Sequence, residues 1–405
     1  MAPMDDVALR YLLLGLRVGR HVSGLIGSYT GPHEIAEAVA GEDPAPPAEL
    51  HAEALRLSDA VAELPTDTPL RRRRAAWLAD QLIALSALAR RAGGEEIGFN
   101  DLAEELYDVP LRPEREEAFA AARRMVGRAI SGGGSLLRRL LEHERRATIP
   151  AEEVVPVLAA IKDAMRRHVR AQLWLPREES VELAGTDRQA GEVDHRYLGS
   201  GRSRVVINVG LPWSLAQLAE VAAEQCYPGQ HAEAAVKDAL LVTAGHAEAT
   251  LRLHLAPESV IRGGIASYAR EVVMSDAELA LELERLSRRF GLKVEVNAEL
   301  ALQRARRLLQ PAIGNAALLL NLDGQSPEAV RTYLMETALL YGDRLEATMQ
   351  QIGDPTWRSY PFTWIEGRRL IGEWLVREGQ TQGYARLLAE QLTPGQIRSA
   401  IGSIG

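Results

Sequence analysis

The stretch that constrains the fold most strongly is "EQCYPGQH", residues 224–231, which lies between two segments with helical periodicity. It contains the only cysteine of the chain, a proline–glycine pair and a histidine. Proline cannot continue the hydrogen-bond ladder of a helix, and glycine permits the turn that folds the chain back. Ser214 and Gln217 have the spacing of a capping box for the first segment. The stretch therefore predicts a joint between two helices.

The composition sets limits on the class of protein. Of 405 residues, 46% are hydrophobic and 25% are charged, the usual balance of a globular protein. The net charge of −8 provides no basic face for nucleic acid. Of 47 cationic residues 44 are arginine, which together with abundant alanine indicates a high-GC bacterial genome. A single cysteine excludes an internal disulfide and a thiolate-rich zinc site.

The first 20 residues contain a short apolar run that is preceded by two aspartates and interrupted by Arg17. This pattern fits neither a signal peptide nor a membrane span. We therefore expect a cytoplasmic protein that binds neither nucleic acid nor a membrane.

Apolar residues recur at spacings of three and four over most of the chain, which predicts amphipathic helices. Ser326-Pro327 and "TPGQ" (393–396) are start signals of such helices. Residues 202–209 alternate and are β-branched, as in a strand, and residues 292–297 are a weaker candidate. The clearest helical segments are 75–92, 151–174, 277–289, 298–309 and 327–350.

These segments predict a mainly α protein with one small β-sheet. We expect one large helical domain, 1–405, in which an N-terminal helical subregion (1–150) is followed by a second subregion (151–405) that contains the stretch 224–231.

The segment around this stretch, "SLAQLAEVAAEQCYPGQHAEAAVKDALLV" (214–242), resembles the active-site region of a bacterial domain-of-unknown-function family. That family has an HExxPGHH signature and is related in fold to the Taq-type thermostable metallocarboxypeptidases. When the two are aligned on Tyr227-Pro228-Gly229, the first histidine and the glutamate of the signature fall on Glu224 and Gln225. The two final histidines fall on Gln230 and His231.

The resemblance covers essentially the whole chain. In the downstream segment Gly263 stands where the family has a glutamate, which we take to be a metal ligand, and near the N-terminus Gly27 stands where an aspartate is usual. The resemblance implies a large helical, metallocarboxypeptidase-like (gluzincin-related) fold. The other segments that carry it are "GLRVGRHVSGLIGSYTGP" (15–32), "RYLGSGRSRVVINVGLPW" (196–213), "VIRGGIASYA" (260–269) and "RSYPFTWIEGRRL" (358–370).

A hydrolytic zinc site needs three protein ligands and a carboxylate base for the bound water. Gln225 has the shape of glutamate but no titratable carboxyl, and Gly263 offers no ligand. Of the set that the resemblance implies, at most His231 survives. Zinc is therefore expected for the family but predicted to be absent here, with no other cofactor.

Glu224, Gln225 and His231 then form a vestigial or repurposed cleft, which leaves three interpretations. In the first, Glu224 and His231 form an ion pair that raises the pKa of the histidine. In the second they act as acid and base in a metal-independent enzyme, for instance in specialised metabolism. In the third the chain is a zinc hydrolase with replacement ligands. Cys226 is either a nucleophile activated by His231 or a buried small hydrophobe.

The resemblance also indicates residues that bind a substrate, since several segments line the cleft in the family. Arginine suits the recognition of a carboxylate because its guanidinium donates two parallel hydrogen bonds. The candidate substrate-binding residues are Tyr197, Arg202, Tyr227, Tyr360 and Arg368.

We favour a protein that has lost its zinc site, a pseudoenzyme or ligand-binding protein without peptidase activity. Its partner would be a small molecule or a peptide in a central cleft. If the scaffold is intact, a variant that combines Glu224→His, Gln225→Glu, Gln230→His and Gly263→Glu should acquire affinity for zinc.

Overall fold

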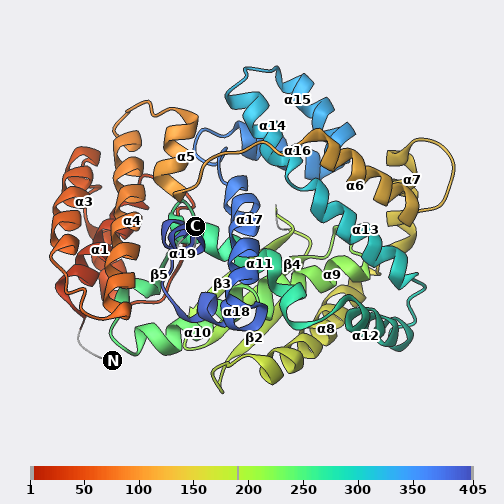
Figure 1. Ribbon diagram of the computed structural model, residues 1–405, viewed down its shortest axis with the longest axis horizontal. Coiled ribbons are helices and arrows are strands. Elements are labelled where there is room, and N and C mark those ends of the chain that lie inside the picture. The colour runs from red at the N-terminus through yellow and green to blue at the C-terminus, as the bar shows by residue number, and fades with distance from the viewer. Residues whose placement is uncertain (1–3, 189–190, 403–405) are drawn as a thin grey trace.

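A computed structural model describes residues 4–188 and 191–402 of the chain. Helices make up most of it (Figure 1). The N-terminal region contains α1 (Asp6–Val18), α2 (His33–Gly41), α3 (Pro47–Ala62), α4 (Pro69–Ala92) and α5 (Phe99–Tyr107). The helices α6 (Glu116–Ala129), α7 (Leu136–Ala147) and α8 (Ala151–Gln172) follow.

The second half of the chain is also mainly helical. Around the joint lie α9 (Leu215–Val221), the π-helix η1 (Ala222–Cys226), α10 (Gln230–Lys237), the π-helix η2 (Asp238–Val242) and the 3-10 helix η3 (Ala247–Thr250). Next come α11 (Pro257–Val273), α12 (Asp276–Arg289), α13 (Val296–Leu309) and α14 (Ala312–Asn321). The last helices are α15 (Pro327–Tyr333), the π-helix η4 (Leu334–Ala338), α16 (Gly342–Gly353), α17 (Pro361–Glu378), α18 (Gln380–Ala389) and α19 (Pro394–Gly402).

Two small sheets occur in the described part of the chain. In the larger one β4 (Arg202–Asn208) lies between β2 (Ser180–Thr186), with which it is parallel, and β3 (Val193–Gly199), with which it is antiparallel. In the smaller one β1 (Ile26–Tyr29) pairs antiparallel with β5 (Leu251–Leu253). The mainly helical fold and the strand at 202–209 are confirmed. The expectation of a single sheet is wrong, because β1 finds a partner more than 200 residues away along the chain.

The predicted helix starts are confirmed by side-chain caps. The hydroxyl of Ser326 accepts a hydrogen bond from the backbone N–H of Ala329, and Pro327 is the first residue of α15. Thr393 and Gln396 form a reciprocal capping box at the start of α19. Each cap satisfies backbone donors that the first turn of a helix leaves unpaired.

Two local expectations are wrong. Residues 292–295 form a loop, and the helix α13 begins at Val296. The alternation at 292–297 reflects a loop with one side packed on the core, since no neighbouring strand pairs with it. The expected helix 327–350 is interrupted after η4, where Leu339 and Gly342 adopt positive φ angles of 56° and 55°. A left-handed residue cannot continue an α-helix.

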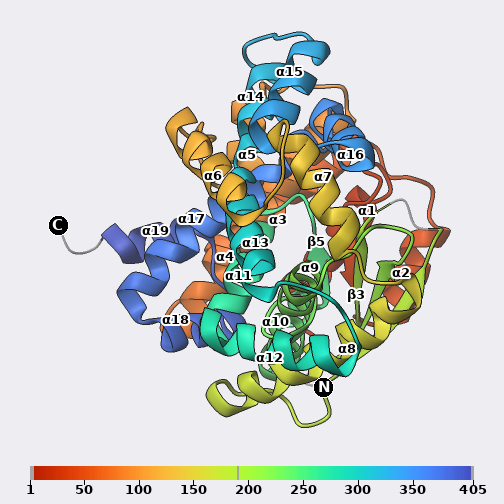
Figure 2. The same cartoon turned by 90° about the vertical axis from the view of Figure 1, so that its right-hand side faces the viewer.

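The helix α11 lies in the middle of the molecule and packs along α17, with the N-terminal helices to one side and α13 to the other (Figures 1 and 2). Three glycines allow α11 and α17 to approach closely, because a Cβ at Gly263, Gly264 or Gly367 would lie within 2.7 Å of an atom of the facing helix. The main hydrophobic core joins α8, α9, α11, α12, α17 and α18. No helix in the described residues is long and apolar enough to cross a membrane.

Candidate functional site

The predicted helix joint at residues 224–231 is confirmed. The helix α9 begins with the expected capping box of Ser214 and Gln217 and continues into η1. The backbone N–H of Gly229 then donates to the carbonyl oxygen of Ala223 at 2.9 Å. A Cβ at Gly229 would lie 2.0 Å from the carbonyl oxygen of Glu224, so only glycine fits the turn. His231 lies on one face of this joint, where it is fully buried, and Glu224 lies on the other, where it is partly exposed.

The closed face is built around His231, whose side chain is fully buried. Its Nε2 lies 3.1 Å from a carboxylate oxygen of Glu179, and its Nδ1 lies 2.8 Å from the hydroxyl of Ser203 on β4. The same carboxyl of Glu179 also accepts hydrogen bonds from Tyr227, Arg166 and Arg170. We call Glu179, Ser203, Tyr227, His231 and these two arginines the closed face.

Burial opposes the ionisation of Glu179, but the hydrogen bonds from its partners outweigh this effect and lower the pKa of the carboxyl to about 2. Burial also disfavours the imidazolium and lowers the pKa of His231 despite its contact with Glu179. A neutral histidine next to an ionised carboxylate must carry its proton on Nε2, so Nδ1 accepts from Ser203. Ser203 in turn accepts from His195, whose Nε2 lies 3.1 Å away.

This geometry corrects the interpretation of His231. Its acidic partner is Glu179 and not Glu224, and its pKa is lowered and not raised. The predicted ion pair between Glu224 and His231 is therefore wrong. Serine, histidine and carboxylate follow each other as in a hydrolase triad, but the residue Ser203 is only 2% exposed. The arrangement holds the joint to the sheet and offers no surface to a substrate.

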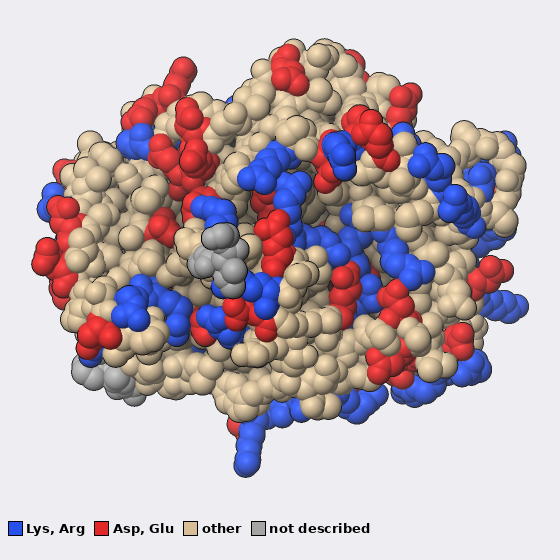
Figure 3. Space-filling model, viewed as in Figure 1, with Lys and Arg blue, Asp and Glu red and all other residues tan. Residues whose placement is uncertain are grey.

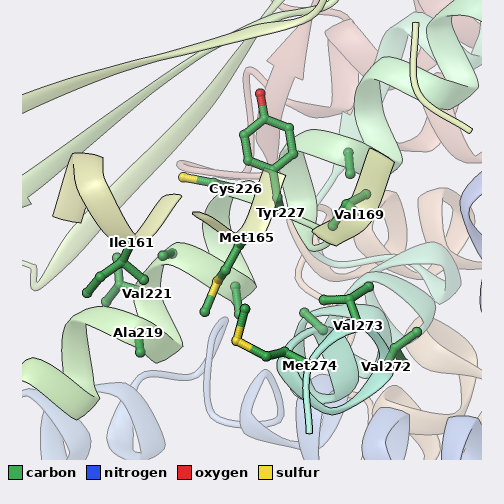
Figure 4. Packing of buried hydrophobic residues seen from close by; sticks show 14 of the residues in the cluster. Ile161, Met165, Val169, Ala219, Val221, Cys226, Tyr227, Val272, Val273 and Met274 are labelled. Atoms are coloured by element: carbon green, nitrogen blue, oxygen red, sulfur yellow. The ribbon is translucent and has the colours of Figure 1, made fainter. Parts of the chain in front are cut away.

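Cys226 and Tyr227 point into the protein. Cys226 is fully buried among apolar residues of α8 and α11, and burial raises the pKa of its thiol to about 12. Figure 4 shows Cys226 beside Tyr227, whose hydroxyl points away from the apolar cluster. These surroundings favour the interpretation of Cys226 as a small core residue, because only a thiolate is an effective nucleophile.

The open face of the joint carries Glu224, which is partly exposed. Burial raises the pKa of its carboxyl to about 8, and the nearby Glu220 contributes to the rise. Arg307 on α13 and Arg368 on α17 oppose it. The carboxyl of Glu224 makes no hydrogen bond or ion pair with any other residue in the described ranges. Its carboxyl is therefore available to a ligand.

The two arginines beside Glu224 are held by acidic side chains. Arg307 forms ion pairs with Glu220, at 2.5 Å, and with Glu271 on α11. Arg368 lies 2.9 Å from the same carboxylate of Glu271 and donates to the backbone carbonyl of Ser267. We call Glu220, Glu224, Glu271, Arg307 and Arg368 the open face. In the view of Figure 3, Lys and Arg side chains gather at a hollow beside α13 and α17.

The residues at the family's metal positions do not fit a zinc ion. Both ring nitrogens of His231 are occupied on the closed face, whereas Glu224 lies on the open face beside two guanidinium groups. A Cβ at Gly263 would lie 2.7 Å from the carbonyl oxygen of Thr363 and 2.9 Å from the Cα of Trp364. A glutamate therefore has no space there. Gly263→Glu can help to restore a zinc site only if α11 and α17 move apart, and that expectation stays a prediction.

Of the five candidate substrate-binding residues, Arg368 lies close enough to Glu224 for its charge to lower the pKa of that carboxyl. Tyr197 is buried, and its hydroxyl donates to Asp238 at 2.6 Å. Arg202 is exposed at the start of β4. Tyr227 belongs to the closed face, and Tyr360 packs against His254 and Trp357 beside the N-terminal core. Of the three candidate catalytic residues, Glu224 and His231 lie on different faces, and Gln225 is partly exposed.

Several residues of the site had no role in the sequence analysis. Glu220 precedes Glu224 by four residues, so helical spacing alone could have placed the two carboxyls together. Glu179, Ser203, Glu271 and Arg307 come from other elements, and no motif marks them. Within the described ranges, no group of three or more His, Cys, Asp and Glu side chains is placed to hold a metal ion.

Comparisons with known proteins support the fold but assign no function. No family model and no curated protein matches the chain. A solved structure described as "the putative lipoprotein from Colwellia psychrerythraea" is 14% identical over 87% of this chain, with a TM-score of 0.55. A "putative lipoprotein of unknown function from Shewanella oneidensis" is 11% identical over 90% of this chain, with a TM-score of 0.50. This chain spans 65% of the first protein's length and 75% of the second's, and at these identities the similarity shows the fold alone.

Proposed function

We propose that this chain has a metallocarboxypeptidase-like, gluzincin-related scaffold that no longer carries a zinc site. It acts as a ligand-binding protein without peptidase activity, and its ligand is a small molecule or a peptide in the central cleft. A cytoplasmic location is part of the same proposal.

The observation that supports this proposal is that the residues at the positions of the expected zinc ligands do not point to one place. Both ring nitrogens of His231 have hydrogen-bond partners on the closed face, and Glu224 lies near two arginines on the open face. Gly263 packs closely against α17. Zinc ligands must converge on one point, with bonds of about 2 Å. The open face keeps polar side chains that are suited to binding, and all of them except the buried Glu220 are partly exposed.

The test is elemental analysis of protein purified without chelator, together with a peptidase assay in the presence and absence of a chelator. We expect far less than one equivalent of zinc and no cleavage that the chelator abolishes. About one equivalent of tightly held zinc, lost together with peptide cleavage on chelation, would contradict the proposal. In that case Glu224→Ala and His231→Ala would show whether either side chain holds the metal.

A further inference from the structure

The open face belongs to a larger ion-pair network, in which the charges do not balance. Ion pairs there join guanidinium groups to carboxylates in one network across α9, α11, α13, α17 and the start of α12. Four arginines share three carboxylates, which leaves one positive charge in excess while Glu224 is neutral. The arginines are Arg270, Arg304, Arg307 and Arg368, and the carboxylates are Glu220, Glu271 and Asp276.

Arg368 has donors to spare and is held in a fixed orientation. A guanidinium carries five N–H groups in a rigid plane. Arg368 uses donors for the carbonyl of Ser267 and the carboxylate of Glu271, and its guanidinium lies 4.3 Å above the ring of Tyr268. Its side chain is still 30% exposed, compared with 10% for Arg307. Of the two arginines, Arg368 is therefore the more accessible to a ligand.

We infer that the open face binds an oxyanion, the carboxylate or phosphate group of a small ligand, on Arg368 and Arg307 beside Glu224. The inference rests on the proposed function, because a zinc ion at this joint would itself supply the positive charge that holds an anion. The oxyanion supplies the missing negative charge, and planar guanidinium groups match its geometry. The neutral carboxyl of Glu224 donates a hydrogen bond to it instead of repelling it.

Calorimetric titration at low salt and near pH 6.5 tests the site with three probes: inorganic phosphate, N-acetylalanine and N-acetylalanine amide. We expect at least one of the two anions to bind and the uncharged amide not to bind. Arg368→Gln should weaken the binding of that anion by about tenfold, the effect of losing a charge-assisted hydrogen bond. Arg377→Gln, on the same helix but bonded to Glu378 and the backbone of Ile401, is the matched control and should bind as the wild type does.

Each outcome has a definite meaning. Binding of N-acetylalanine alone assigns the site to carboxylates, and binding of phosphate alone assigns it to phosphate groups. No binding of either anion up to about 10 mM, or equal binding by the wild type and Arg368→Gln, overturns the inference. Zinc content is measured on the same preparation, so failure of the proposed function and failure of the oxyanion site are seen in separate measurements.

Discussion

The two faces of the joint shift the pKa of a carboxyl in opposite directions. On the closed face Glu179 is ionised, is fully surrounded by donors and has a pKa lowered to about 2. On the open face the carboxyl of Glu224 has no hydrogen-bond partner in the described chain, and its pKa is raised to about 8. Glu179 contacts the joint and Glu224 belongs to it, yet the carboxyl of Glu179 stabilises the fold and that of Glu224 destabilises it when it is charged.

This difference separates structural from functional roles. A buried carboxylate whose hydrogen bonds are all made within the protein contributes stability and specificity to the fold. A carboxyl that is left without partners costs stability, and such groups are concentrated at binding and catalytic sites. Glu179, the partner of His231, is a carboxylate of the first kind, and Glu224 is a carboxyl of the second kind.

The largest effect is expected from Glu179→Ala. The substitution leaves the Nε2–H of His231 and the hydroxyl of Tyr227 without their acceptor inside the protein. Breaking a buried ionic network costs about 3–5 kcal/mol. We expect the lower end, about 3 kcal/mol, because Arg166 and Arg170 are partly exposed and can be hydrated. Urea unfolding at pH 7 measures the loss.

Glu182→Ala is the matched control, since Glu182 lies on β2 nearby and is exposed, with Arg204 as its partner. Exposed surface pairs of this kind contribute little to stability, so Glu182→Ala should unfold close to the wild type. The folded pKa of Glu179 lies below its ordinary value of 4.5, so its contribution is complete above pH 4.5 and is lost as the pH falls toward 2. The difference between the wild type and Glu179→Ala should therefore narrow in acid. A difference that stays constant from pH 7 to pH 3 would show that Glu179 acts through packing and not through charge.

A smaller loss is expected from Gly263→Ala, which tests whether α17 has closed over the position of the family's glutamate. The new methyl group would lie 2.7 Å from the carbonyl oxygen of Thr363, so the helices must separate. Overpacking of this kind costs about 1–3 kcal/mol. Gly41→Ala, with no atom within 4 Å of the added Cβ, should leave the free energy of unfolding nearly unchanged. Equal stability of Gly263→Ala and the wild type would mean that α17 can move away, and a ligand at this position would again be possible.

The joint itself was predictable from sequence, whereas its two faces were not. Proline and glycine act on the backbone within a few residues, so Pro228 and Gly229 predicted the turn correctly. The partner of His231 is 52 residues away, in the segment before β2, and no periodicity records such a contact. The ion pair with Glu224 was inferred from closeness in sequence, which does not determine the side of a joint on which two side chains lie.

Contacts between distant segments, which sequence patterns do not reveal, also explain the other differences between the predictions and the structure. Arg307 lies in a segment whose helix was predicted, but its position over Glu224 depends on how α13 packs against α9. The residues 292–297 alternate as well as those of β4 do, and only β4 has neighbouring strands. Gly263 was interpreted as the loss of a ligand, whereas the structure also shows it as a close contact between two helices.

The smallest effect is expected from Glu224→Gln, and it should have the opposite sign to that of Glu179→Ala. Burial raises the pKa of Glu224 from its ordinary value of 4.5 to about 8, and the negative charges of Glu220 and Glu192 contribute to the rise. The positive charges of Arg307 and Arg368 lower the pKa but do not outweigh burial. The stability that comes from its neutral form is complete below pH 4.5 and is lost as the pH rises through 8. Glutamine stays neutral, so the variant should be more stable than the wild type at pH 9, by about 1 kcal/mol or less because the site is partly hydrated, and equal to it at pH 5.

Glu182→Gln is the control, because the pKa of Glu182 is lowered and the difference from the wild type should be the same at pH 5 and pH 9. Urea unfolding at both pH values measures these differences, and a loss of stability at pH 9 in Glu224→Gln would show that Glu224 is charged and paired, so that the two faces would no longer differ.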